Sequence, residues 1–161
     1  MKVTLHRVGK GRTPWADAAV EDYRRRLARS FDFSEQLDRP EPFKGDVERV
    51  KAAEGARLLA GLREGDRLIP LDERGEQVTT ELFSTWIDEA ARGSARRMVF
   101  AIGGPYGHPP EVRKAAWKVL GLSRMVLNHE LARVLLVEQL YRAGTLLWGG
   151  AYHHGGAELP D

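Results

Sequence analysis

The chain of 161 residues contains no cysteine. That absence excludes a disulfide framework, a thiol nucleophile and any cysteine-ligated metal site. No apolar run is long enough to cross a bilayer, and the N-terminal segment, residues 1–6, lacks the apolar core of a signal peptide. We therefore expect a cytoplasmic protein that does not associate with membranes.

Several nucleotide-binding and metal-binding motifs are also missing. Gly9-Lys10-Gly11 begins like a dinucleotide fingerprint, but Pro14 stands where the third glycine is needed. This argues against an ordinary nucleotide-fold methyltransferase or dehydrogenase. The sequence has no phosphate-loop motif and no His-Glu-x-x-His pattern. We expect no metal cofactor.

Charge is nearly balanced, at 25 basic and 23 acidic residues, for a formal net charge of +2. Residues 1–30 are an exception, with eight Lys and Arg against three acidic residues. Such an excess suits a phosphate backbone, but it equally suits a solvated helix face, and charge alone favours the second interpretation.

Hydrophobic residues make up 42% of the chain, enough for one folded domain over residues 1–161, with a tail from about 149 that we expect to be partly mobile. Periodicity and cap residues predict strands over 2–8, 31–37, 67–71, 97–102 and 123–127, a turn over 72–75, and helices over 14–29, 46–65, 79–92, 109–120 and 130–147. The first helix is expected to bury Trp15, Ala19, Tyr23 and Leu27.

Alternating strands and helices predict an α/β fold with a mainly parallel sheet flanked by helices. Pro70 favours an edge or end position for its strand.

A glycine-rich loop, Gly103-Gly104-Pro105-Tyr106-Gly107, follows the apolar strand 97–102 directly. Ligands of open α/β sheets bind outside the carboxyl ends of the strands, and glycine lets the backbone approach them closely. The loop is therefore a candidate ligand contact. A tight turn before a helix explains the same residues equally well.

Polar residues interrupt the otherwise apolar helix predicted over 130–147. His129 and Arg133 share one face, and Glu138, Tyr141 and Arg142 lie three or four residues apart. Polar groups on so apolar a helix need partners or a ligand. A catalytic role and a buried salt-bridge network at a subunit contact are both consistent with this pattern.

Tyr152-His153-His154 forms a third candidate near the C-terminus. No third ligand with suitable spacing supports metal binding by the histidines. These residues are either exposed side chains without a function or contacts for RNA. The second interpretation is possible because aromatic and imidazole rings stack on unpaired bases.

The ordered C-terminal segments of the chain resemble a known family, the bacterial ribosomal RNA large subunit methyltransferase H family of the SPOUT superfamily. The resemblance is carried by Ile102-Gly103-Gly104-Pro105-x-Gly107, Leu122–His129, Arg133–Ala143 and Tyr152-His153. The opening segment around Val8-Gly9 and Leu71-Asp72-x-x-Gly75 also fit, so the similarity covers essentially the whole chain.

The resemblance implies a SPOUT-type α/β fold with a deep trefoil knot, a homodimer packed through the last helix, and S-adenosylmethionine as methyl donor. It also implies methylation of N3 of a pseudouridine in the helix-69 hairpin of 23S rRNA, on the assembled ribosome. The implied donor-binding residues are Leu71, Gly103, Gly104, Ser123, Arg124, Met125, Val126, Leu127 and Asn128.

The chain departs from the family pattern at a few positions. Tyr106 stands where the family commonly has Glu, and Asn128 and Glu130 replace the prolines that commonly flank His129. The sequence also continues for eight residues after His153.

Methyl transfer to a pseudouridine N3 requires removal of its proton, and a general base typically contributes about 10²–10⁴-fold. His129, Glu138 and His153 are candidate bases. Arg133 and Arg142 are expected to hold phosphate or stabilise charge, and Tyr152 to position the base. The alternatives are a SPOUT enzyme acting on tRNA or a ribose hydroxyl, and an inactive RNA-binding dimer.

Overall fold

The computed structural model describes residues 1–9 and 13–149. Its strands are β1 (Lys2–Val8), β2 (Asp32–Asp38), β3 (Asp66–Glu76) and β4 (Arg97–Ile102). Its helices are α1 (Pro14–Leu27), α2 (Val47–Ala60), α3 (Thr80–Arg92), α4 (Pro110–Ala115) and α5 (His129–Trp148). Within these residues no helix is both long enough and apolar enough to span a membrane.

The four strands form one parallel sheet in the order β2-β1-β4-β3. The predicted alternation and the mainly parallel sheet are therefore confirmed. Pro70 lies on the edge strand β3, opposite Ala101 of β4. An edge is where a residue without an N–H costs least, as predicted from its position in the sequence.

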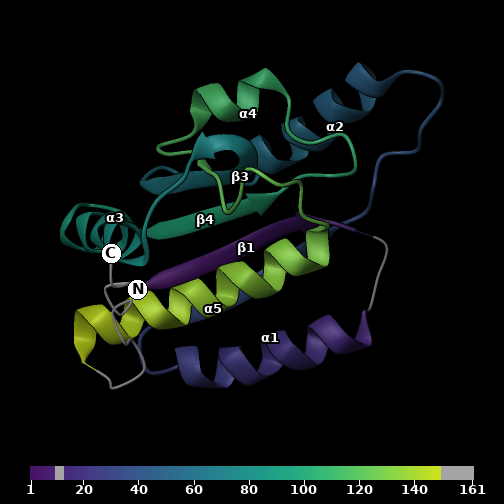
Figure 1. The fold of residues 1–161 in the computed structure, drawn as a ribbon. Coiled ribbons are helices and arrows are strands. Elements are labelled where there is room, and N and C mark those ends of the chain that lie inside the picture. The colour runs from purple at the N-terminus through teal and green to yellow at the C-terminus, as the bar shows by residue number, and fades with distance from the viewer. Residues whose placement is uncertain (10–12, 150–161) are drawn as a thin grey trace, which may run out of the picture.

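Helices cover both faces of the sheet (Figure 1). On one face, α1, α3 and α5 enclose the larger core, which includes Leu27, Phe83, Phe100 and Leu136. On the other face, α2 and α4 pack a smaller cluster of Leu58, Leu68, Val99, Ala101 and Val112. Strands buried on both faces explain the nearly continuous apolar sequence of β4.

Local signals set most helix starts. Asp46, Thr79 and Asn128 each accept a backbone N–H from the first turn of the helix that follows. The buried side of α1 differs from the prediction: Ala16, Val20 and Leu27 are buried, whereas Trp15 is 52% exposed. The buried face of α1 therefore lies about one residue further along the helix than predicted. Of the four residues predicted to be buried, Leu27 is the one that is fully buried.

Three predicted elements were wrong, and all three lie where residues 116–128 pass β3. The helix predicted over 109–120 ends at Ala115, and residues 123–127 form a loop rather than a strand. The predicted turn 72–75 is instead part of β3.

Long-range hydrogen bonds account for these differences. The Trp117 N–H donates to Leu68 O, and the Glu76 N–H donates to Val119 O, both at 2.9 Å. At the crossing, a Cβ on Gly75 would lie 2.7 Å from the Gly121 backbone nitrogen, so only glycine allows this approach. The hydrophobic periodicity of a segment cannot reveal hydrogen bonds to a strand far away in the sequence.

Candidate functional site

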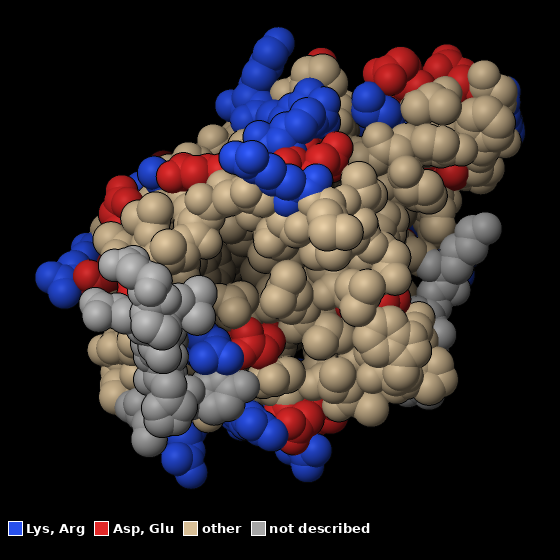
Figure 2. All heavy atoms as spheres, in the orientation of Figure 1, with Lys and Arg blue, Asp and Glu red and all other residues tan. Residues whose placement is uncertain are grey.

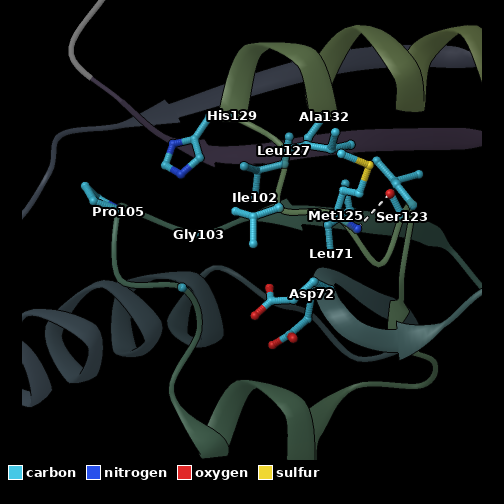
Figure 3. A pocket seen from close by; sticks show the side chains of 15 residues that line it. Leu71, Asp72, Ile102, Gly103, Pro105, Ser123, Met125, Leu127, His129 and Ala132 are labelled. Atoms are coloured by element: carbon cyan, nitrogen blue, oxygen red, sulfur yellow. Dashed lines mark hydrogen bonds between the residues drawn. The ribbon is translucent and has the colours of Figure 1, made fainter.

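A pocket opens at the carboxyl end of β4, beside the middle of β3, and the carboxyl ends of strands are where open α/β sheets bind ligands (Figure 3). Four segments form it: the middle of β3, the glycine loop after β4, the loop that precedes α5, and the first turn of α5. Its lining residues are Leu71, Asp72, Glu73, Ile102, Gly103, Gly104, Pro105, Gly107, Leu122, Ser123, Met125, Val126, Leu127, His129 and Ala132.

The glycine loop presents backbone to this pocket. The Gly107 N–H donates to Gly104 O at 2.9 Å, and Gly107 has a φ of +75° that favours glycine. Gly104 packs so closely on the Glu54 carboxylate that a Cβ would overlap its Oε2 atom. The loop therefore combines the two properties of glycine that made it a candidate: a left-handed turn and a close approach.

The loop before α5 forms the opposite wall. The Ser123 hydroxyl accepts the Met125 N–H at 2.9 Å, and the Asn128 side chain caps α5 by accepting the Leu131 N–H at 2.9 Å. Met125 and Val126 are 78% and 83% exposed. Of the nine residues that the resemblance implied for donor binding, seven line the pocket, while Asn128 and Arg124 do not. Donor binding by the set stays a prediction.

Asp72 is the buried charge in the pocket wall, and sequence reasoning missed it. Its carboxylate accepts hydrogen bonds from Arg74 Nε and Nη2, both 2.9 Å, and from Arg113 Nη1 at 3.0 Å. The hydrogen bonds from Arg74, helped by Arg113, hold the pKa of Asp72 well below its usual range despite burial. The signal available in the sequence was its position directly after Leu71 in the apolar run 68–71.

The structure separates His129 from Arg133. His129 is half-buried at the pocket, whereas the Arg133 side chain points into the protein and is only 5% exposed. Its guanidinium contacts the carboxylates of Asp17, Glu35 and Glu130 at 2.6 to 3.0 Å. Within one protomer, Arg133 therefore belongs to a buried salt-bridge network, which is one of the two interpretations of the polar residues on this helix.

Glu138 and Arg142 form a second pair on α5, with Arg142 Nη2 2.6 Å from Glu138 Oε1. The thirteen-residue separation of His129 and Arg142 along one helix corresponds to about 20 Å. One protomer therefore does not bring them together. Tyr152 and His153 lie outside the described residues, as do His154 and most of the predicted tail.

A buried polar cluster lies beneath the glycine loop. His6 Nε2 lies 2.9 Å from Asp38 Oδ2, and His108 Nε2 lies 3.1 Å from Ala101 O. Burial lowers the pKa of both histidines. Glu54 is 6% exposed, and its Oε2 atom has no hydrogen-bond partner. Among the described residues, no group of three or more His, Asp or Glu side chains is arranged to hold a metal ion.

Comparisons with known proteins agree with this arrangement. A family profile described as "Predicted SPOUT methyltransferase" matches residues 1–153. The chain therefore belongs to the SPOUT methyltransferases, which confirms the predicted SPOUT-type α/β fold and implies the trefoil knot of that family.

Its relatives narrow the membership further. The chain is 38% identical to the ribosomal RNA large subunit methyltransferase H of Geotalea daltonii, 40% to that of Porphyromonas gingivalis and 39% to that of Trichlorobacter lovleyi. Each match covers 96% of this chain and 99% or 100% of the relative. The chain belongs to the ribosomal RNA large subunit methyltransferase H family, as its resemblance predicted.

Among solved structures, the chain matches the SpoU methyltransferase AviRb from Streptomyces viridochromogenes, crystallised with AdoMet. The TM-score is 0.43 and the identity 13%, over 88% of this chain and 57% of that one.

Proposed function

We propose that this protein transfers a methyl group from S-adenosylmethionine to N3 of a pseudouridine in the helix-69 hairpin of 23S rRNA, on the assembled ribosome. The observation that carries the proposal is the pocket itself. Segments around residues 71–73, 102–107 and 122–132 meet there, in a chain whose full-length relatives are named ribosomal RNA large subunit methyltransferase H. A ribosomal substrate also supports a cytoplasmic location.

The pocket suits the proposed donor chemically. Leu71, Ile102 and Leu127 provide apolar walls, while the glycine loop offers bare backbone for polar contacts. S-adenosylmethionine supplies an electrophilic methyl group and leaves as a neutral thioether. Seven residues of the implied donor set line this pocket, which supports donor binding here rather than at another surface.

Location supports His129 as the general base, because it lines the pocket. The substrate N3–H must lose its proton before the nitrogen can attack the methyl carbon, and a neutral imidazole can accept that proton. Glu138 is paired with Arg142 on α5 and is absent from the pocket lining. Among the described residues the geometry therefore favours His129 over Glu138.

Basic side chains offer a surface for RNA near the pocket. They gather in the region of α4, which carries Arg113 and Lys114 in its last turn (Figure 2). Arg113 also contacts Asp72 in the pocket wall, which links this surface to the site. Phosphate contacts by Arg and Lys fix the register of a nucleic acid without reading its sequence.

A homodimer completes the proposal. Met125 and Val126, which line the pocket, and Leu131 on α5 are exposed, and Leu135 lies one turn after Leu131. Exposed apolar surface of this kind is typical of a protein interface. Because His129 and Arg142 lie far apart in one protomer, a catalytic role for Arg142 requires a second copy.

Two measurements test the proposed function. Calorimetry should show S-adenosylmethionine binding to wild-type protein, and the His129→Ala variant should bind the donor but methylate ribosomes at roughly 10²-fold lower single-turnover rate. Absence of donor binding, together with absence of transfer to any RNA, would favour the inactive RNA-binding dimer. If His129→Ala and His153→Ala both kept the wild-type rate, neither histidine would be the base.

A further inference from the structure

Two exposed aromatic rings from distant segments meet beside the pocket. Phe43, in the loop between β2 and α2, contacts Tyr106 in the glycine loop, with ring centroids 5.9 Å apart and an interplanar angle of 42°. Phe43 is 56% exposed and Tyr106 is 41% exposed. Both segments leave the carboxyl ends of the strands, on the same side of the sheet (Figure 1).

The loop that carries Phe43 is held in place by hydrogen bonds and ion pairs. The Glu41 N–H donates to Glu54 Oε1 at 3.0 Å, and Glu54 is buried directly beneath Gly104. The Glu41 carboxylate pairs with Arg49 and Arg57 of α2, each at 3.2 Å. Glu54 therefore fixes both aromatic segments relative to each other.

Tyr106 stands beside the pocket rather than inside it. Its neighbours Pro105 and Gly107 line the pocket, whereas Tyr106 does not. A ring at this position therefore adjoins the pocket but lies outside the space proposed for the donor.

We propose that the Phe43–Tyr106 pair is a stacking platform for an unpaired RNA base that flanks the target nucleotide. The inference rests on the proposed function and adds a subsite to it. Unpaired bases of RNA loops are commonly recognised by stacking on aromatic side chains, which tolerates any base because each has a π face. Two solvent-exposed rings in contact beside the pocket of an RNA methyltransferase have the chemistry and the position for this role.

Tyr106 is not among the residues that line the pocket, so the methyl transfer itself does not require its ring. The platform is therefore expected to strengthen substrate binding and to leave the chemical step unchanged.

The test compares Phe43→Ala, Tyr106→Ala and Tyr106→Glu with the ring-preserving variants Phe43→Tyr and Tyr106→Phe. Loss of a ring should raise the KM for ribosomes roughly 5- to 50-fold while kcat and donor affinity stay at wild-type values. The ring-preserving variants should keep the wild-type KM for ribosomes. Val47→Ala removes an exposed apolar side chain just after the same loop and should change nothing.

Chemical probing of ribosomal RNA bases supplies the second measurement. Wild-type protein, but not Phe43→Ala, should protect a loop base next to the methylated nucleotide. A raised KM without any change in base protection would indicate a protein partner and overturn the proposal, as would an unchanged KM or a loss of donor affinity. Failure of the wild-type protein to methylate ribosomes would instead contradict the proposed function itself.

Discussion

The guanidinium of Arg133 donates two hydrogen bonds to the carboxylate of Glu35, both 2.7 Å long. Asp17 and Glu130 accept further bonds from the same side chain. Burial opposes the charge, but these carboxylates raise the pKa of Arg133 above its usual range. The residue thus ties the start of α5 to α1 and β2.

Replacing Arg133 with Met should destabilise the fold by about 3–5 kcal/mol, because three carboxylates would lose their shared cation. Urea unfolding measures this difference. The control is Arg26→Met, which breaks an exposed pair with Asp22 and should cost at most about 1 kcal/mol. A stable Arg133→Met protein with weakened ribosome binding would instead support the RNA-anchoring role predicted from the sequence.

Gly104→Ala should distort the glycine loop, because the new methyl group would overlap the buried Glu54 carboxylate. We expect donor affinity to fall roughly tenfold, equivalent to about 1.4 kcal/mol, in calorimetry. Gly61→Ala is the matched control, since its Cβ would make only ordinary contacts, 3.4 Å and beyond. Equal donor affinity in both variants would show that this loop does not bind the donor.

Asp72 should make stability depend on pH in the acid range. Its pKa is depressed in the folded state, so its contribution is complete above the unfolded value of about 3.9 and is lost as the pH falls below it. Asp72→Asn should lower the unfolding free energy by about 2 kcal/mol at pH 7 and by progressively less below pH 4.

The control for Asp72 is Asp88→Asn, in a partly exposed pair with Arg92 on α3. It should change the unfolding free energy by no more than about 0.5 kcal/mol. A difference between wild type and Asp72→Asn that stayed constant from pH 7 to pH 3 would refute the linkage.

Val126→Asp should weaken the proposed homodimer, because Val126 is 83% exposed in one protomer and the substitution places a charge on the apolar surface proposed for the dimer contact. Sedimentation should show a monomer at protein concentrations where the wild type is a dimer. Val47→Asp, on the opposite face of the sheet, should leave the dimer intact. A monomeric wild type would remove the basis for assigning Arg142 a catalytic role.

The sequence predicted the parts of the fold that depend on local chemistry. Asp46 and Thr79 mark helix starts through their side-chain caps, and Pro70 marks the edge strand. The prediction of secondary structure was wrong where residues 116–128 cross β3, because the backbone groups of Trp117 and Val119 form hydrogen bonds with β3 instead of with neighbours in a helix. The close contact of Gly75 with Gly121 allows residues 116–128 to cross β3 there. Nothing in the sequence around either glycine indicates that the two are in contact.

The candidate site shows the same division. Gly103 and Gly104 were recognised because a glycine loop after an apolar strand is a local signal. Asp72 was missed because its near partner Arg74 lies in the segment predicted as a turn, and its other partner Arg113 is 41 residues away. Arg133 was given two interpretations, since its spacing on α5 fixes its face but not the carboxylates that lie opposite.

The central claim is tested most directly by mapping the methyl group. Purified protein and labelled S-adenosylmethionine would be incubated with ribosomes that lack the modification, and the labelled nucleotide identified. The account predicts one labelled position, N3 of a pseudouridine in helix 69 of 23S rRNA, with little transfer to the isolated hairpin. Label on tRNA or on a ribose hydroxyl, or equal labelling of the naked hairpin, would contradict it.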